Sequence, residues 1–131
     1  MRCGAKRIGH GVRSIEDLKL VSELAELAQE GMVLEICPTS NLQTNAVANI
    51  YEVIQELDKK GVRFGINTDN DTVSNVNIIE EYINLLENTD YTIEDLKRIN
   101  INAISGAFIS PNEKAELKAK IMDYKESELQ K

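Results

Sequence analysis

Three short polar segments hold the side chains of this sequence that could do chemistry. His10, the only histidine, stands between two glycines; residues 37–41 offer a thiol, two hydroxyls and an amide; Asp69 stands between Thr68 and Asn70. An imidazole exchanges protons near neutral pH, and a carboxylate can move a proton or bind a metal ion. Each segment directly follows an apolar run that reads as a strand. Because parallel strands end at one edge of a sheet, we expect the three segments to meet there.

Each of these residues also has a purely structural interpretation. A lone histidine between glycines is often a turn or core residue, and Asp69 could close an Asx-turn or cap the next helix. Residues 37–41 could be a loop whose hydroxyls simply satisfy the end of a strand. Cys37 as a nucleophile would need His10 as its base, and nothing in the sequence places the two together. Glu35 lies inside a predicted strand, where it would need a cationic partner.

The elements that position these segments alternate between strand and helix. Apolar runs predict strands at residues 6–10, 32–36 and 62–66. Helical spacing predicts a helix from residue 18 to Gly31, then helices around residues 47–60 and 79–88, and two more that begin near Thr92 and Ser110. Ser14 with the acid three residues later resembles a capping box, and so does Ser110 with Glu113.

Three βα units at about thirty-residue spacing, followed by two further helices, predict an α/β protein with a parallel sheet. Three strands leave two unpaired edges, which soluble proteins rarely tolerate uncovered. The chain is therefore either a small complete sandwich or part of something larger. A complete flavodoxin-like sandwich is the weaker interpretation, because the first turn carries no glycine-rich phosphate motif.

Composition excludes several classes of protein. The chain has 131 residues, with 22 acidic against 15 basic side chains and a net charge of -7, which argues against a nucleic-acid partner. The start of the chain lacks the apolar segment of a signal peptide, and no apolar run is long enough to span a membrane. Cys3 and Cys37 form no CxxC pair. A charged tail at residues 125–131 is expected to fray. We expect a cytoplasmic protein.

Taken together, the three segments resemble a known enzyme family. Residues 7–11 (RIGHG), 34–44 (LEICPTSNLQT) and 65–69 (GINTD) are similar, in this order, to the C-terminal part of the adenosine deaminase family. The resemblance covers nearly the whole chain, from about residue 7 to the helix that opens at Ser110. It implies a zinc-dependent (β/α)8 barrel of the amidohydrolase superfamily, of which residues 1–131 would be a single partial domain holding the sixth to eighth strands.

The resemblance also implies roles for three residues. Asp69 matches the aspartate that ligates zinc and orients the attacking water, and His10 matches the histidine beside that water. Asn70 falls where many members have a second aspartate that hydrogen-bonds the purine ring, and an amide can still donate or accept. The implied reaction is metal-assisted hydrolysis of the 6-amino group, which converts adenosine to inosine and ammonia.

Two motifs of the family are absent from this sequence. The two-histidine motif and the His-Ala-Gly-Glu motif would supply three zinc ligands and the glutamate that protonates the ring, whereas this chain has one histidine. His10, Asp69 and two distant cysteines fall short of a catalytic zinc site. We therefore expect zinc and a purine nucleoside to bind the complete enzyme, and this chain alone to bind no zinc specifically and to be inactive. The alternative is a non-catalytic half-barrel that pairs through its strand edges with itself or with a complementing N-terminal half.

Overall fold

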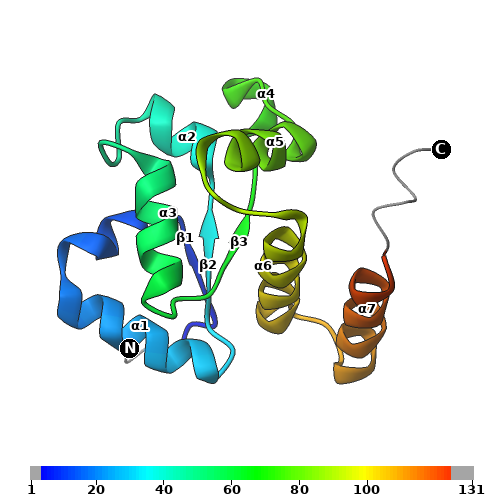
Figure 1. Ribbon diagram of the computed structural model, residues 1–131. Coiled ribbons are helices and arrows are strands. Elements are labelled where there is room, and N and C mark those ends of the chain that lie inside the picture. Colours follow the sequence, from blue (N-terminus) through cyan, green and yellow to red (C-terminus); the bar gives the residue numbers. More distant parts are fainter. Residues whose placement is uncertain (1–3, 125–131) are drawn as a thin grey trace.

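The strands form one parallel sheet in a computed structural model that describes residues 4–124 (Figure 1). Their order in the sheet is β1-β2-β3, and the strands are β1 (Arg7–Gly9), β2 (Val33–Ile36) and β3 (Phe64–Ile66). Glu35 in the middle strand is in register with Gly9 on one side and Gly65 on the other. All three strands run the same way, so their carboxyl ends share one edge. The predicted parallel sheet is confirmed.

Helices follow each strand. Within the described residues they are η1 (Val12–Glu16, a 3-10 helix), α1 (Leu18–Gln29), α2 (Pro38–Gln43), α3 (Ile50–Lys59), α4 (Asp71–Ser74), α5 (Ile78–Asn88), α6 (Ile93–Gly106) and α7 (Pro111–Asp123). The α/β class, the three βα units and the two closing helices are as the sequence predicts. Helix α2 is a difference, because residues 37–41 were expected to form a loop.

The cap of α7 is the one expected, and α6, which begins where the sequence predicts, has a cap of the same kind. The side chain of Thr92 accepts from the third residue of α6, and Ser110 does the same for α7, with the acid at that position returning the bond in each case. Each cap satisfies backbone N–H groups that the first turn of a helix leaves without partners.

The predicted cap of α1 is wrong. Ser14 lies in η1, and its hydroxyl has no partner among the described residues. Asp17 is the N-cap instead, and its Oδ1 accepts from the backbone N of Lys19 at 2.9 Å and of Leu20 at 3.2 Å. The Asp17 carboxylate stands directly before the helix, so it can accept hydrogen bonds from two backbone N–H groups of the first turn. Ser14 lies three residues earlier, too far from these N–H groups to accept from them.

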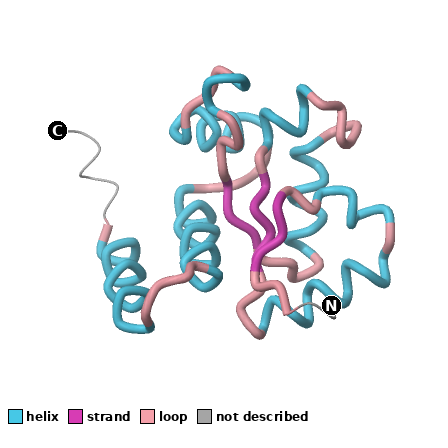
Figure 2. The backbone as a smooth tube through the Cα atoms, turned by 180° about the vertical axis from the view of Figure 1, so that it is seen from behind, coloured by secondary structure: helices cyan, strands magenta, loops and turns pink. Residues whose placement is uncertain are grey.

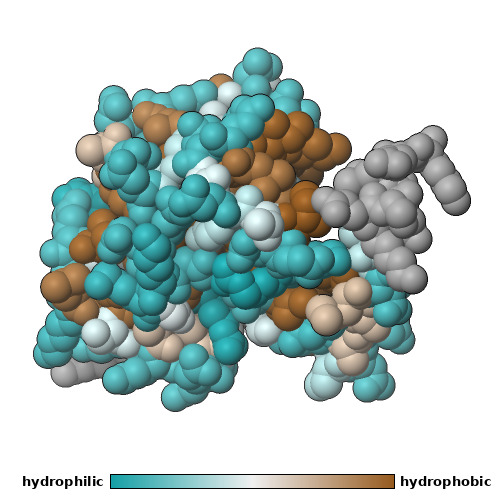
Figure 3. Space-filling model, in the orientation of Figure 1, coloured by the Kyte–Doolittle hydropathy of each residue, from teal (hydrophilic) through white to brown (hydrophobic). Residues whose placement is uncertain are grey.

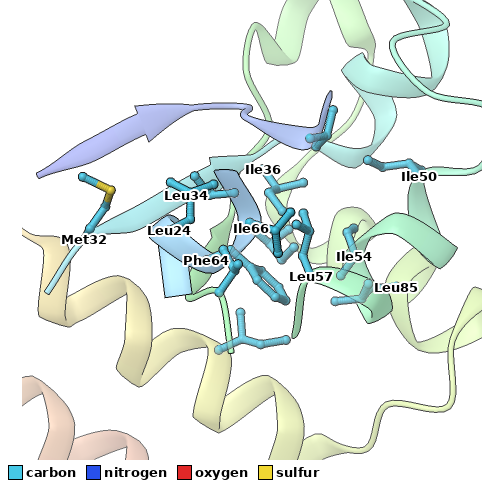
Figure 4. Close-up of a cluster of buried hydrophobic side chains, with 14 residues drawn as sticks. Leu24, Met32, Leu34, Ile36, Ile50, Ile54, Leu57, Phe64, Ile66 and Leu85 are labelled. Atoms are coloured by element: carbon cyan, nitrogen blue, oxygen red, sulfur yellow. The ribbon is translucent and has the colours of Figure 1, made fainter. Parts of the chain in front are cut away.

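The main core lies between one face of the sheet and helices α1 and α3 (Figure 4). Side chains alternate along a strand, so Leu34, Ile36, Phe64 and Ile66 share this face. They pack with buried side chains of the two helices, among them Leu24, Ile54 and Leu57. Removing each such side chain from water stabilises the fold by about 1.5–3 kcal/mol. This packing holds the strand ends in place.

Helix α6 approaches β3 and β2 from the opposite face, and Figure 2 shows it beside the strands from behind. Two glycines permit the close approach. A Cβ on Gly65 would lie 2.8 Å from Cβ of Ala103, and a Cβ on Gly106 would lie 2.7 Å from Cγ2 of Val33. Both distances are too short for real carbon atoms. Glycine is therefore required where α6 meets the sheet.

The apolar stripe of α5 is not its buried face. The fully buried residues of α5 include Glu81 and Leu85, whereas Ile79 is 68% and Ile83 46% exposed. The stripe faces an open groove of about 660 Å³ between α5, α6 and α7. Apolar residues of this region appear brown in Figure 3.

No helix within residues 4–124 combines the length and the apolar content needed to cross a bilayer. Cys3 and the predicted charged tail at 125–131 lie outside the described residues.

Candidate active site

His10 and Asp69 meet at the carboxyl edge of the sheet. Nε2 of His10 lies 3.6 Å from Oδ2 of Asp69, and the two side chains are 42% and 44% exposed. His10 directly follows β1, and its backbone N donates to the carbonyl of Glu35, which extends the ladder by one residue. The structure therefore brings together the two predicted site residues, which are 59 positions apart (69 − 10) in the chain. It leaves their side chains within reach of solvent.

Both residues have left-handed backbones. The φ angle is 56° at His10 and 61° at Asp69. Residues other than glycine rarely adopt this conformation, which costs energy and concentrates at functional sites. Here one left-handed residue follows β1 and the other follows β3, the two strands that flank β2.

Helix α2 supplies two buried side chains that hold this pair. The hydroxyl of Ser40 donates to Oδ2 of Asp69 at 2.8 Å. Nδ2 of Asn41 lies 3.1 Å from Nδ1 of His10. Ser40 and Asn41 can reach the pair because Pro38 takes the first helical position directly after β2 and starts α2 there. Of the two interpretations of these polar groups, the purely structural one does not account for Ser40, because its hydroxyl bonds the Asp69 carboxylate.

A residue that the sequence analysis missed fixes the start of α2. Glu81 on α5 is fully buried, and its carboxylate accepts from the backbone N of Thr39 at 3.2 and 3.3 Å. Burial raises the pKa of the Glu81 carboxyl, and the bonds from Thr39 oppose that shift. Its spacing of four from buried Leu85 was the available signal, since residues four apart share a helix face.

Cys37 lies beside the pair, at the edge of the sheet where its segment was expected. Its Sγ, a nitrogen of His10 and a carboxylate oxygen of Asp69 all lie within 4.8 Å of one another. Burial raises the pKa of the Cys37 thiol to about 11, and the negative charge of Asp69 adds to the shift. The thiol is therefore protonated at neutral pH when no metal is bound, which disfavours it as a nucleophile.

Glu35 has the cationic partner that its place in a strand required. Nε of Arg7 lies 3.3 Å from its carboxylate, across neighbouring strands. The guanidinium of Arg7 in turn lies 4.3 Å from the ring centroid of Phe108. The carboxylate is thus paired with a cation within the sheet, and 36% of the side chain stays exposed.

The pair stands between two cavities. One, of about 470 Å³, opens at the carboxyl edge and is lined by Glu35, Cys37, Asn67 and Thr68 as well as His10 and Asp69. The other, of about 540 Å³, lies beside β1 and α1 and has an apolar wall that includes Ile8, Leu24 and Leu34. The polar cavity is large enough for a small molecule and reaches both predicted site residues.

Asn70, the third predicted site residue, follows Asp69 and caps α4. Its Oδ1 accepts from the backbone N of Val73 at 3.0 Å. The amide oxygen is used by the helix, so the NH2 group is the half of this side chain that can donate to a ligand.

The donors at this edge suit a zinc ion. Imidazole nitrogen, carboxylate oxygen and cysteine sulfur are the three kinds of atom that bind zinc in proteins. Asn41 is only 3% exposed, and its Oδ1 has no partner in the described part of the chain. Nδ2 of the same amide faces Nδ1 of His10, so the imidazole is held with Nε2 toward Asp69.

Solved structures share this arrangement of strands and helices. An adenine deaminase from Arthrobacter aurescens superposes with a TM-score of 0.82 at 24% identity, over 90% of this chain and 36% of that one. An amidohydrolase from Burkhoderia ambifaria with bound Zn gives a TM-score of 0.76 at 26% identity, over 89% of this chain and 32% of that one. The likeness identifies the fold as part of the barrel that these enzymes have.

Comparisons of sequence identify the family. The adenosine deaminase of Enterococcus faecalis is 41% identical over 120 residues, which are 90% of this chain and 34% of the relative. The adenosine deaminase of Mycobacterium ulcerans is 37% identical over 124 residues, 88% of this chain and 34% of the relative. The chain thus spans about a third of the length of the curated relatives it matches. The sequence profile described as Adenosine deaminase matches residues 1–124. With its strand-end residues in the arrangement described above, this chain belongs to the adenosine deaminase family.

Proposed function

We propose that this chain supplies part of the active site of a zinc-dependent deaminase that hydrolyses the 6-amino group of an aminopurine, converting adenosine to inosine and ammonia. The observation that carries the proposal is the 3.6 Å approach of His10 to Asp69 at the carboxyl edge of a parallel sheet. Barrel enzymes hold their reacting groups at this edge. The relatives named adenosine deaminase support the choice of reaction.

Each polar residue of the site has a task in this reaction. Asp69 would ligate zinc and is placed to accept a proton from the attacking water, while Ser40 holds its Oδ2 in place. His10 directs Nε2 toward the same water and holds or moves its proton, because Nδ1 faces Asn41. Asn70 donates from its NH2 group to a nitrogen of the purine ring. Zinc, when bound, lowers the pKa of water so that the nucleophile is available at neutral pH.

We propose that the remaining groups come from a polypeptide that supplies the rest of the barrel. The reaction needs further metal ligands and an acid for the ring, and the sequence holds a single histidine. In this proposal residues 1–131 form the C-terminal portion of a (β/α)8 deaminase, and the chain is inactive when alone. The carboxyl-edge cavity of about 470 Å³ then forms one wall of the purine site.

The test is an adenosine absorbance assay on the chain alone and on the chain mixed with the missing portion of a related deaminase. We expect no turnover from the chain alone and turnover from the mixture. His10→Ala and Asp69→Asn should each abolish the turnover of the mixture, whereas Glu116→Gln, an equivalent change on exposed α7, should leave it intact. Full activity of a mixture that contains Asp69→Asn would refute the proposal.

A second candidate function is a non-catalytic module that associates through its sheet edges. Within residues 4–124, β1 and β3 each pair on one side only, so both offer unpaired backbone groups. The apolar cavity beside β1, which includes Ile8 and Leu34, could receive side chains of an added strand. Light scattering separates the candidates: a concentration-dependent dimer supports edge pairing, and a monodisperse monomer at all concentrations counts against it.

A further inference from the structure

Helix α2 carries both side chains that hold the His10–Asp69 pair, yet it has no cap of its own. Its N-cap residue is Cys37, whose side chain accepts no hydrogen bond from the first turn. Every other α-helix within residues 4–124 begins with an aspartate, asparagine, threonine or serine that does accept one. With 6 residues, α2 is also too short to be stable by itself in water. A group outside α2 must therefore hold its first turn.

Glu81 on α5 supplies the missing acceptor. Because Pro38 has no backbone N–H, Thr39 is the first residue of α2 that can donate from the backbone. Both carboxylate oxygens of Glu81 accept from that group, at 3.2 and 3.3 Å, although the two residues are 42 positions apart. Glu81 is 0% exposed, and the ion pairs found within residues 4–124 do not include it. Burying a carboxylate costs energy that hydrogen bonds must offset. Here the bond to α2 does so.

The next two residues of α2 carry this anchoring to the reacting pair. The hydroxyl of Ser40 donates to Oδ2 of Asp69 at 2.8 Å, and Nδ2 of Asn41 lies 3.1 Å from Nδ1 of His10. Ser40 is 8% and Asn41 3% exposed, so both are fixed by packing as well as by these contacts. A single helical turn thus connects the buried carboxylate of Glu81 to both members of the pair.

Glu81 itself stays away from the space that a ligand could fill. Within residues 4–124, it lines neither the carboxyl-edge cavity of about 470 Å³ nor the cavity of about 540 Å³ beside β1. Any effect of Glu81 on a reaction at this edge must therefore pass through α2. A small displacement of reacting groups lowers the rate of a reaction strongly, even when the substrate keeps its own contacts.

We propose that Glu81 is a positioning residue for the reaction at the carboxyl edge. By holding the backbone of Thr39, it sets where Ser40 and Asn41 place Asp69 and His10. The effect on catalysis rests on the proposed function, but the anchoring of α2 does not. Glu81 acts as a hydrogen-bond acceptor, so an amide should replace it and an apolar side chain of similar size should not.

The first test is NMR of the purified 131-residue chain at one fixed pH. His10 is the only histidine, so its imidazole signals are assigned without ambiguity. Glu81→Leu should speed hydrogen exchange of the Thr39 amide by roughly tenfold or more. It should also shift the imidazole nitrogen signals of His10 in the same direction as Asn41→Ala does. Glu81→Gln should leave both observations close to those of the wild-type chain, and so should Glu87→Gln, the matched control on the exposed side of α5.

The amides of α1 report whether a variant has unfolded as a whole. If they lose protection in Glu81→Leu, the comparison passes to Glu81→Asp, which is one methylene shorter and draws the carboxylate away from Thr39. That variant should give the same two effects. Histidine signals that stay at their wild-type positions in a folded Glu81→Leu or Glu81→Asp chain overturn the proposal.

The second test measures adenosine turnover of the chain complemented with the missing portion of a related deaminase, at saturating zinc. Glu81→Leu should lower kcat by roughly tenfold or more, because the reacting groups are displaced. KM should stay within about twofold, because Glu81 makes no contact with the substrate. Glu81→Gln should retain most of kcat. A wild-type kcat in Glu81→Leu, or a loss confined to KM, contradicts the positioning role. Absence of turnover from the wild-type mixture would refute the proposed function, whereas the NMR comparison would still decide whether Glu81 holds α2.

Discussion

The hydroxyl of Ser40 donates a 2.8 Å hydrogen bond to Oδ2 of Asp69, the carboxylate oxygen that faces the imidazole of His10. Ser40 lies on α2, and Asp69 follows β3, so the bond joins two successive βα units. It fixes one oxygen of the carboxylate and leaves the other for a metal ion or a water proton.

Removing this bond should impair the reaction without unfolding the chain. In the complemented deaminase, Ser40→Ala should lower kcat/KM by roughly 10- to 100-fold, because partners of metal-binding carboxylates have effects of that size. Ser40→Thr keeps a hydroxyl and should retain most of the activity. The assay is adenosine absorbance at fixed zinc, and equal activity of the Ala and wild-type proteins would exclude this role.

The buried carboxylate of Glu81 should make stability depend on pH. Burial raises its pKa in the folded chain above the ordinary value of 4.5, so the folded state holds the proton more tightly than the unfolded state. The stability that this tighter proton binding contributes is fully present at pH values below the pKa of Glu81 in the unfolded chain. It is lost as the pH rises through the pKa of Glu81 in the folded chain. Glu81→Gln cannot titrate. Urea unfolding from about pH 4 to about pH 7 should therefore show the wild-type chain losing stability relative to the variant. A difference independent of pH would contradict the assignment.

Gly65 should tolerate no side chain. Gly65→Ala places a Cβ 2.8 Å from Cβ of Ala103, which forces α6 away from the sheet. Overpacking of this kind costs about 1–3 kcal/mol in the free energy of unfolding. Gly9→Ala is the matched control in β1, because an added Cβ there meets nothing within 4 Å. Thermal unfolding of both variants compares them, and equal midpoints would count against the close contact.

The start of α1 offers a test of the observed cap against the expected one. Asp17→Ala removes the acceptor for two backbone N–H groups and should destabilise the chain by about 1 kcal/mol. Ser14→Ala removes a buried hydroxyl that has no partner within residues 4–124, so it should be neutral or slightly stabilising. Chemical denaturation measures both. The reverse order of effects would restore the capping box that the sequence suggested.

Local patterns in the sequence were enough for the strands and the longer helices, but not for α2 or the cap of α1. The three strands, the five longer helices and the caps at Thr92 and Ser110 follow from apolar spacing and from cap residues, which act over a few positions. The edge of the sheet where His10 and Asp69 would stand also follows, because parallel strands end on one side. Their chemical roles, and that of Asn70, remain predictions.

The contacts that make the site depend on tertiary structure. Helix α2 was expected to be a loop, yet it aims Ser40 and Asn41 at the pair, and Glu81 anchors it from α5. Periodicity marks Glu81 as sharing a face with Leu85 but cannot say which backbone N–H it will meet. The buried face of α5 also depends on tertiary structure. The spacing of the apolar residues of α5 predicted a helix, but it did not predict that these residues would be exposed.

The sequence alone thus determined which residues end the strands, because that depends on neighbours in the chain. Only the fold decided that Cys37 lies within 4.8 Å of His10 and Asp69. The physical reason is that pairing β2 between β1 and β3 is a long-range contact, and this pairing sets the three strand ends side by side. The left-handed turn at His10 lies between two glycines, whereas Asp69 has no glycine beside it, and the packing of the sheet and its helices holds both turns in place.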